Sequence, residues 1–375
     1  MKLLYVFRSL AVWGGIERIL VEKMNYLSLE YGYDIYMLTA DQGCHPVSYH
    51  LDESVHLEDL DIRFHKKYQF AFPRRFWVAR RLKRLYEKRL SERINQIQPD
   101  IIICTTADHI DSLVKLKGSI PMVVESHSIC QRTIEDGNCW LRRKWHRHQY
   151  LKALSKTDVL VALTDGDAAE WRKVHHHVVV IPNLVHLNEG TVSTQENKRV
   201  IFVGRFDYQK RPVKIISIWE KIYLSHPDWQ LDIYGEGELQ QELENEVCSM
   251  DMNIHVHQPT EHIFDCYRES SILVSTSLFE PFGLVIPEAM SCGLPVVSID
   301  CPYGPASIIT DGEDGYLIPD GDEIAFADKL SSLMDSRDLR RTIGTAGIMA
   351  SKRYEASRIM SQWIKLFKKI NDNSN

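Results

Sequence analysis

Two glutamates eight positions apart stand out in the stretch SLFEPFGLVIPEAMSCGLPVVS, because the segment between them carries no other charged residue. They are Glu280 and Glu288. Gly283 and Pro287 argue against one continuous helix through both, since proline is tolerated only in a first helical turn. We therefore expect Glu280 in a loop and Glu288 in the early turns of a helix that begins near Gly283. Carboxylates in these places can accept hydrogen bonds from the hydroxyl groups of a ribose or a sugar.

The start of that helix also suits an anion. Backbone N–H groups around Phe282, Gly283 and Leu284 have no partner within the helix, and an anion can bind there. Arg205 and Lys210 supply two cations on the short loop VGRFDYQKR, although that loop taken alone also fits a solvated basic turn. We interpret the group as a diphosphate site with a polyol held by a carboxylate at either end.

Three more positions lie on loops that follow expected strands. Gly235, in YGEGEL, would let the backbone approach a ligand closely, or it only forms a tight turn. Gly15, in AVWGGIER, suggests a loop with a close backbone approach, and the absence of a GxGxxG fingerprint argues against a dehydrogenase. His127 follows the strand PMVVES, where its side chain would face a cleft, although a lone histidine is more often structural.

These loops require an α/β scaffold. Short apolar runs alternate with helical patterns along the whole chain and predict two doubly wound parallel sheets. The expected strands lie at residues 2–7, 34–39, 100–106, 121–126, 159–164, 178–183, 199–205, 230–237, 254–257, 272–277, 295–300 and 315–319. Ligands of such sheets bind beyond the carboxyl ends of the strands, so we expect the active site in the cleft between two domains.

Bulk composition is consistent with two domains. A chain of 375 residues exceeds one ordinary core, and no apolar run reaches the roughly 18 residues of a membrane span. The eight cysteines form no CxxC pair, which argues against a zinc site or a disulfide framework and favours a cytoplasmic protein. Residues 1–184 hold 27 Lys and Arg against 22 Asp and Glu, whereas the remainder holds 18 against 29. The two halves are therefore expected to meet different partners.

A basic segment, residues 66–89, carries ten Lys and Arg against one acid, interleaved with aromatic and aliphatic residues. It fits peripheral contact with an anionic membrane surface, and it fits equally an amphipathic helix packed on the sheet. No nucleic-acid partner is expected, because no binding motif accompanies the charge. No metal is expected either: the DGD at 165–167 is better interpreted as the start of a helix.

Taken together, VGRFDYQKR, YGEGEL and FEPFGLVIPEAMSCGLPVVSID resemble the retaining GT-B glycosyltransferases of family 4, also called glycosyl transferases group 1, of bacterial surface-glycan type. The E-x7-E pair formed by Glu280 and Glu288 matches that family's signature, and GGIER, LTDGDAAEW and VIPN are similar to its patterns in the first domain and linker. The resemblance implies two Rossmann-like domains that face a central cleft.

The resemblance also implies domain boundaries. Residues 1–184 would form an N-terminal acceptor domain, followed by a linker at 185–198. Residues 199–352 would form the C-terminal donor domain for the nucleotide sugar. A C-terminal helix at 353–375 would cross back to the N-terminal domain.

Each candidate residue takes a role by the same resemblance. Arg205 and Lys210 would hold the donor diphosphate, Glu288 the ribose, and Glu280 the donor sugar near its reacting carbon. The backbone around Phe282, Gly283 and Leu284 would cradle phosphate. His127 would lie beside the donor sugar, and Gly15 would belong to a glycine loop near donor and acceptor. Gly235, whose backbone can approach a ligand, is also expected to bind the donor. The expected catalytic groups are Glu280, His127, Arg205 and Lys210.

The implied activity is retaining transfer of a hexosyl group from a nucleotide-diphosphate sugar, expected to be a UDP-sugar, to a lipid-linked or cell-surface glycan. No cofactor and no metal are expected. Cytoplasmic location, with peripheral contact at the inner face of the membrane, would suit such an acceptor. Two alternatives remain at this point: a nucleotide-sugar epimerase of the same fold, and a non-catalytic nucleotide- or glycan-binding protein.

Overall fold

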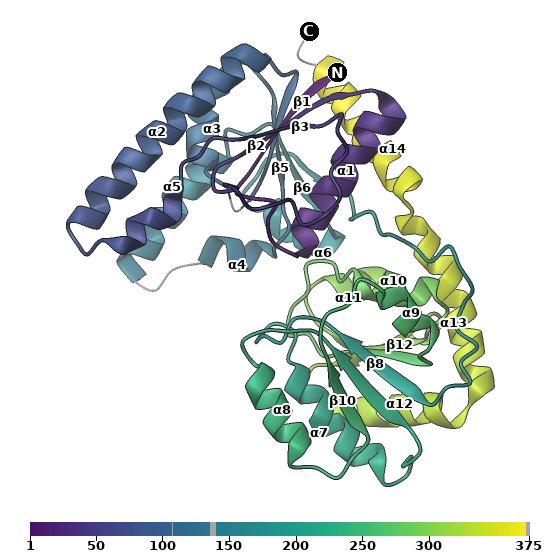
Figure 1. The fold of residues 1–375 in the computed structure, drawn as a ribbon. Coiled ribbons are helices and arrows are strands. Elements are labelled where there is room, and N and C mark those ends of the chain that lie inside the picture. The colour runs from purple at the N-terminus through teal and green to yellow at the C-terminus, as the bar shows by residue number, and fades with distance from the viewer. Residues whose placement is uncertain (107, 136–139, 373–375) are drawn as a thin grey trace. The chain divides into compact units, whose positions relative to one another are not determined.

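The computed structural model describes residues 1–106, 108–135 and 140–372, and the chain divides into two compact units (Figure 1). Unit 1 comprises residues 1–163, 168–181 and 360–375, and unit 2 comprises residues 164–167 and 182–359. Each unit is built around its own parallel sheet. Within the described residues, every helix is too short or too polar to span a lipid bilayer.

Unit 1 contains a seven-stranded parallel sheet in the order β3-β2-β1-β4-β5-β6-β7. Its strands are β1 (Lys2–Phe7), β2 (Asp34–Thr39), β3 (His56–Asp59), β4 (Ile101–Thr105), β5 (Met122–Glu125), β6 (Val159–Ala162) and β7 (Val178–Val180). Most are near-continuous apolar runs, as strands buried on both faces must be. The edge strand β3 was not among the expected strands, because its sequence HLED is mainly polar and none of its residues is buried.

Helices cover both faces of this sheet, and Figure 1 shows α1 and α14 on one side with α2, α3 and α5 on the other. The helical segments of unit 1 are α1 (Gly15–Tyr31), η1 (Phe64–Gln69), α2 (Arg74–Ile97), α3 (Ile110–Leu116), α4 (Cys130–Glu135), α5 (Trp140–Leu154), most of α6 (Asp165–Trp171) and most of α14 (Ala356–Asp372). Apolar residues of α2, among them Leu90 and Ile94, join Leu4 and Ile102 of the strands in one core cluster.

Unit 2 contains a six-stranded parallel sheet in the order β10-β9-β8-β11-β12-β13. Its strands are β8 (Arg199–Val203), β9 (Gln230–Tyr234), β10 (Ile254–His257), β11 (Ile272–Ser275), β12 (Val296–Asp300) and β13 (Tyr316–Pro319). Its helical segments are α7 (Pro212–Tyr223), α8 (Gln240–Cys248), α9 (Ile263–Arg268), α10 (Val285–Ser291), α11 (Gly304–Ile308), α12 (Glu323–Asp335), α13 (Arg337–Ser351) and η2 (Lys352–Tyr354).

The predicted fold class, two doubly wound parallel sheets with flanking helices, is confirmed. Both sheets place their loops after each strand at the carboxyl edge, and that edge carries the candidate residues. The central strands β8 and β11 pair in parallel, with Ile272 opposite Val200. The loops that follow these two strands must therefore lie next to each other.

Candidate active site

The two glutamates occupy the predicted kinds of position. Glu280 lies in the loop between β11 and α10, and Glu288 is the fourth residue of α10. Both are buried, with 7% and 4% of their surface exposed. Gly293, with a φ of +83°, lies just beyond the end of α10 and before β12. A left-handed residue just past a helix is the usual place for glycine, and it lets the chain return directly to the sheet.

The backbone of Glu280 is fixed by the segment that follows β12. Its carbonyl oxygen accepts hydrogen bonds from the N–H groups of Tyr303 at 2.9 Å and Gly304 at 2.7 Å. Gly283 has a φ of +95°, and a Cβ there would lie 3.0 Å from Cγ of Glu280. The position of the Glu280 carboxylate therefore depends on a tight turn for which glycine is the best residue.

Lys210 forms an ion pair with Glu280, although 70 positions separate them in the sequence. The two side chains are only 15% and 10% exposed. The N–H of Leu278 donates to the carbonyl oxygen of Gln209 at 2.8 Å, which joins the loops after β8 and β11. The N–H of Lys210 also donates to Asp207 Oδ1 at 2.9 Å. The pair is therefore held by its backbone as well as by charge.

Arg205, the second expected phosphate cation, is placed differently. Its side chain is 67% exposed and lies 3.0 Å from the carboxylate of Asp207. It also donates to Gln209 Oε1 at 3.2 Å. The structure thus brings Lys210 to Glu280 and leaves Arg205 on the solvent side of the same loop, where its long side chain can reorient at little cost.

The remaining candidate residues of unit 2 are mainly enclosed. Glu288 Oε2 accepts a long hydrogen bond, 3.4 Å, from the hydroxyl group of Tyr267 on α9. Phe282 is buried and packs edge-on against Tyr354, with ring centroids 5.1 Å apart. Leu284 is the residue that precedes the first turn of α10.

Gly235 has a packing role. Its φ is +154°, and a Cβ there would lie 1.9 Å from the carbonyl oxygen of Gly204. Only glycine permits this contact between the loops after β8 and β9. The tight turn considered for YGEGEL is therefore present, and it supports the loop that carries Arg205 and Lys210.

His127 belongs to unit 1, where it is held by a buried carboxylate. Its Nε2 lies 3.2 Å from Oε2 of Glu125, and the two side chains are 5% and 4% exposed. Lys23, from the middle of α1, places its Nζ 2.5 Å from Oε1 of the same carboxylate. The structure therefore adds two residues, Glu125 and Lys23, to the histidine that the sequence indicated.

Burial and charge act against each other in this group. Burial tends to raise the pKa of the Glu125 carboxyl, but the charge of Lys23 and the hydrogen bonds from His127 and Lys23 outweigh it and hold that pKa below its usual range. Burial lowers the pKa of the Lys23 ammonium, and Glu125 opposes that shift. The Lys23 ammonium and the Glu125 carboxylate therefore each stabilise the charged form of the other.

Trp363 of α14 completes the environment of Lys23. The Lys23 ammonium lies 3.4 Å from the centroid of the indole ring, a cation–π contact between the first helix and the last. The signal for the group was present in the sequence: Lys23 follows Leu20 at helical spacing, and Glu125 ends an otherwise apolar strand.

Gly15 is the first residue of α1 and does not lie in the loop before it, so the expectation of a loop residue is wrong at this position. Gly14 is the N-cap, and a Cβ there would lie 2.3 Å from Oε2 of Glu17. Residues 165–167 form the first turn of α6, where the N–H of Asp167 donates to Thr164 Oγ1 at 3.2 Å.

The chain matches two family models that together extend over most of its length. Residues 13–189 match Glycosyltransferase Family 4, and residues 188–349 match Glycosyl transferases group 1. The first match falls mainly on unit 1 and the second on unit 2.

Relatives agree with these matches. The GalNAc-alpha-(1->4)-GalNAc-alpha-(1->3)-diNAcBac-PP-undecaprenol alpha-1,4-N-acetyl-D-galactosaminyltransferase of Campylobacter jejuni is 24% identical over 382 residues, 99% of both chains. An exopolysaccharide phosphotransferase of Streptomyces coelicolor is 30% identical over 221 residues, which are 57% of this chain but 23% of that protein. The chain thus spans less than a quarter of the second relative's length.

A solved structure of a variant of S. aureus TarM, in complex with fondaparinux, alpha-GlcNAc-glycerol and UDP, superposes with a TM-score of 0.77 at 15% identity. The superposition covers 98% of this chain and 99% of that one. With parallel sheets in both units, the E-x7-E pair at the carboxyl edge of the second, and matches to both family models, the chain belongs to the GT-B glycosyltransferases of family 4.

Proposed function

We propose that the protein is a retaining glycosyltransferase that moves a sugar from a UDP-sugar to a lipid-linked or cell-surface glycan. The observation that carries the proposal is the buried ion pair of Lys210 and Glu280 at the carboxyl edge of unit 2. A nucleotide-diphosphate sugar presents both a diphosphate for the cation and sugar hydroxyls for the carboxylate. The Campylobacter relative is named for an undecaprenol-diphosphate acceptor, and the TarM structure contains UDP, which supports this choice of substrates.

In the proposed reaction the donor diphosphate gains negative charge as the glycosidic bond breaks. Lys210, already held by Glu280, and Arg205, brought in from solvent, stabilise that charge. Cations placed before the reaction starts are an effective source of rate acceleration. Glu280 accepts hydrogen bonds from the donor sugar, and Glu288 accepts them from the ribose. His127 contacts the donor sugar, and no metal is required because the two side chains supply the positive charge.

Nucleotide binding tests the donor. Thermal unfolding of the purified protein is measured with UDP, GDP and ADP, each alone. A nucleotide at 100 times its dissociation constant should stabilise the folded state by about 2.7 kcal/mol, because it binds only that state. We expect a rise in melting temperature with UDP and a smaller one with GDP or ADP. A larger rise with GDP or ADP would mean that the donor carries that nucleotide instead of UDP. No rise with any of the three would contradict a nucleotide-sugar enzyme.

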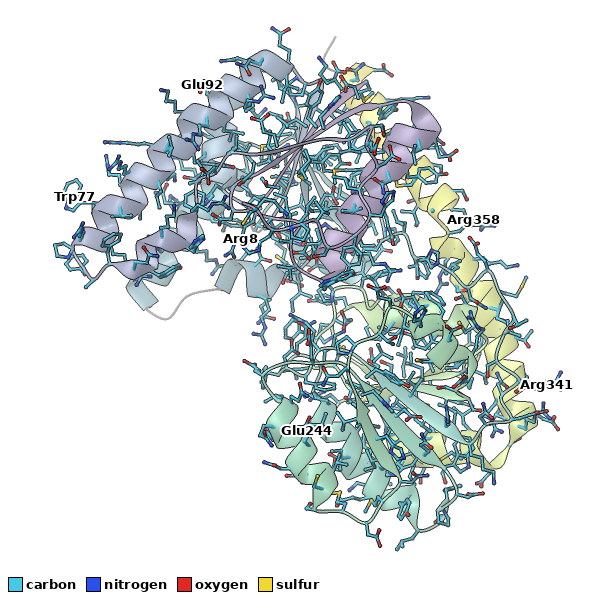
Figure 2. All side chains as sticks on the ribbon, in the orientation of Figure 1. Arg8, Trp77, Glu92, Glu244, Arg341 and Arg358 are labelled. Carbon is cyan, nitrogen blue, oxygen red and sulfur yellow. The ribbon has the colours of Figure 1, made fainter. Side chains whose placement is uncertain are left out.

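We also propose contact with an anionic membrane surface through residues 66–89. The structure forms this basic segment into η1 and the first two-thirds of α2. Large apolar side chains just before α2 and in its first turn are exposed to solvent: Phe72 by 82%, Phe76 by 54% and Trp77 by 65%. Figure 2 shows Trp77 pointing away from the sheet of unit 1. Exposed aromatics beside many cations are typical of a helix that rests on lipid headgroups.

Vesicle flotation tests this surface. The wild-type protein should float with vesicles that contain anionic lipid, and less so as salt is raised, because salt screens the charges. A variant with Phe76→Ser and Trp77→Ser should lose most of this binding. Leu29→Ser, which removes an apolar side chain that is 63% exposed on α1, is the matched control and should float as wild type does. No flotation of the wild type at low salt would reject membrane contact.

A further inference from the structure

A pocket of about 190 Å³ lies at the carboxyl edge of the sheet in unit 1, away from His127 and Glu125, and it shares Lys67, Tyr68 and Tyr86 with the basic segment. Its walls come from the segments that follow β1, β2 and β4, and from η1 and α2. The lining residues that matter below are Arg8, Asp41, Phe64, Lys67, Asp108 and His109.

Aromatic rings form one side of this pocket. The rings of Phe64 and His109 have centroids 4.5 Å apart, and Tyr86 lies 5.6 Å from Phe64 and 5.4 Å from His109. Burial lowers the pKa of His109, so its imidazole is neutral near neutral pH and offers one hydrogen-bond donor and one acceptor. An aromatic wall with a few polar groups suits the apolar face and the hydroxyls of a sugar ring.

Two carboxyl groups in the pocket are held by the backbone, and burial raises the pKa of one of them, Asp108, to about 7. Asp41 Oδ1 accepts the N–H of Phe64 at 2.7 Å, and Asp108 Oδ2 accepts the N–H of Thr105 at 2.7 Å. Because each short Asp side chain accepts a backbone N–H directly, both carboxyl groups are held in place. A fixed acceptor is what the recognition of a particular hydroxyl group requires, since little freedom is lost on binding.

Two cations line the same pocket. The Nε of Arg8 lies 3.5 Å from Asp41 Oδ2, yet the Arg8 side chain is 75% exposed while that of Asp41 is 7% exposed. The half-buried Lys67 is on η1, beside the exposed Lys66, which does not line the pocket. Asp41 offsets the charge of Arg8, so Lys67 supplies the positive charge at the opening, and an acidic substituent on the sugar would complement it.

The position of the pocket connects it to the candidate active site within unit 1. β4 lies between β1 and β5 in the sheet, and β5 leads to Glu125 and His127. Neighbouring strands are about 4.8 Å apart, so the pocket and the histidine loop are at the same edge, one strand from each other. A ligand in the pocket would therefore lie at the same edge of the sheet as His127.

We propose that this pocket is an acceptor subsite that binds a phosphorylated sugar, with the ring against Phe64 and His109 and the phosphate near Arg8 and Lys67. The proposal rests on the proposed function, since it supplies the acceptor for that reaction. It names residues of unit 1 only, so it is tested separately from the donor site of unit 2.

The test uses N-acetylglucosamine 1-phosphate, N-acetylglucosamine and inorganic phosphate as probes, with UDP present to occupy the donor site. Saturation-transfer NMR should show the sugar phosphate bound with a dissociation constant of about 1 mM, and each of the other two probes bound more weakly. Lys67→Ala should weaken binding of the sugar phosphate about tenfold, which corresponds to the loss of one charged contact. Lys66→Ala removes the same charge one residue away and should leave the affinity unchanged.

Equal losses in Lys67→Ala and Lys66→Ala would overturn the proposal, because they would indicate general surface charge instead of a pocket. Inorganic phosphate binding as well as the sugar phosphate does would also overturn it and leave an anion site only. His109→Ala provides the second variant: it should reduce the preference for sugar phosphate over phosphate. The melting shift with UDP, measured on the same samples, reports on the proposed function independently of these results.

Discussion

Replacement of Lys210 with Ala is expected to lower the turnover number about a hundredfold to a thousandfold. Lys210 is one of two cations assigned to the donor diphosphate, and its ion pair with Glu280 holds it in place before the donor binds. Without Lys210, the negative charge that develops on the diphosphate in the transition state loses one of its fixed cations. A water molecule in its place must reorient first, so it stabilises that charge less. The readout is the UDP released when the sugar of a UDP-sugar is transferred to an acceptor or, slowly, to water.

Lys214→Ala is the matched control for this prediction. Lys214 lies four positions further on, is 19% exposed against 15% for Lys210, and also pairs with a glutamate, Glu323 at 3.0 Å. That pair joins α7 to α12 and has no place in the site. Lys214→Ala should retain turnover near wild type. Equal losses in the two variants would mean that Lys210 contributes only to folding.

Glu280→Gln separates the two members of the pair. The substitution removes a negative charge beside Lys210, the cation we assign to the diphosphate, so UDP should bind at least as tightly as in wild type. Turnover should still fall, because an amide holds Lys210 and the sugar hydroxyls less firmly than a carboxylate does. Weakened UDP binding in Glu280→Gln would show that the carboxylate acts mainly by positioning Lys210, without an interaction of its own with the sugar.

The scaffold could be predicted from the sequence because its strands are buried on both faces. Runs such as IIICT in β4 and VVSID in β12 are typical of a central parallel strand. The edge strand β3 was not predicted because its side chains form no apolar pattern. It pairs with a single neighbouring strand, β2, so it does not need to be buried on both faces. Because patterns of hydrophobicity reflect burial, they do not predict strands that are not buried.

The backbone of the candidate site was predictable, and its side-chain pairing was not. Gly283 and Pro287 restrict the local chain enough to place Glu280 in a loop and Glu288 in a helix. The pairing of Lys210 with Glu280 depends on the order of strands in the sheet, which puts β8 beside β11. Sequence reasoning assigned the lysine to phosphate and the glutamate to hydroxyls, and nothing in either loop indicates that the two meet before any ligand binds.

The largest expected effect on stability comes from Lys23→Met. The substitution keeps most of the side-chain volume but leaves the Glu125 carboxylate, 4% exposed, without its cation. Removal of one member of a buried ion pair typically costs about 3–5 kcal/mol, because the remaining charge stays desolvated. Met also gives up the cation–π contact with Trp363, which lies 3.4 Å from the ammonium. We expect the unfolding transition to move to lower denaturant, as followed by the tryptophan fluorescence of the protein.

Lys173→Met is the control, because Lys173 pairs with Glu170 at 2.6 Å on the surface, with 65% of the lysine side chain exposed. Such a pair contributes at most about 1 kcal/mol. The double variant Lys23→Met with Glu125→Leu should recover part of the lost stability, since it removes the unpaired charge as well. If Lys23→Met were no more destabilising than Lys173→Met, the charges of this group would not be interdependent.

The pH dependence of the free energy of unfolding gives an independent test of the Lys23–Glu125 pair. The pKa of Glu125 is held below its ordinary value of about 4.3, so the stability it contributes is present above that value. It is lost as the pH falls through the lowered pKa of the folded state, where protonation breaks the pair. Lys23 stays protonated in both states over this range and adds no change. The stability difference between wild type and Glu125→Gln should therefore shrink below about pH 4, and a difference that stays constant would show that Glu125 is not ionised in the folded protein.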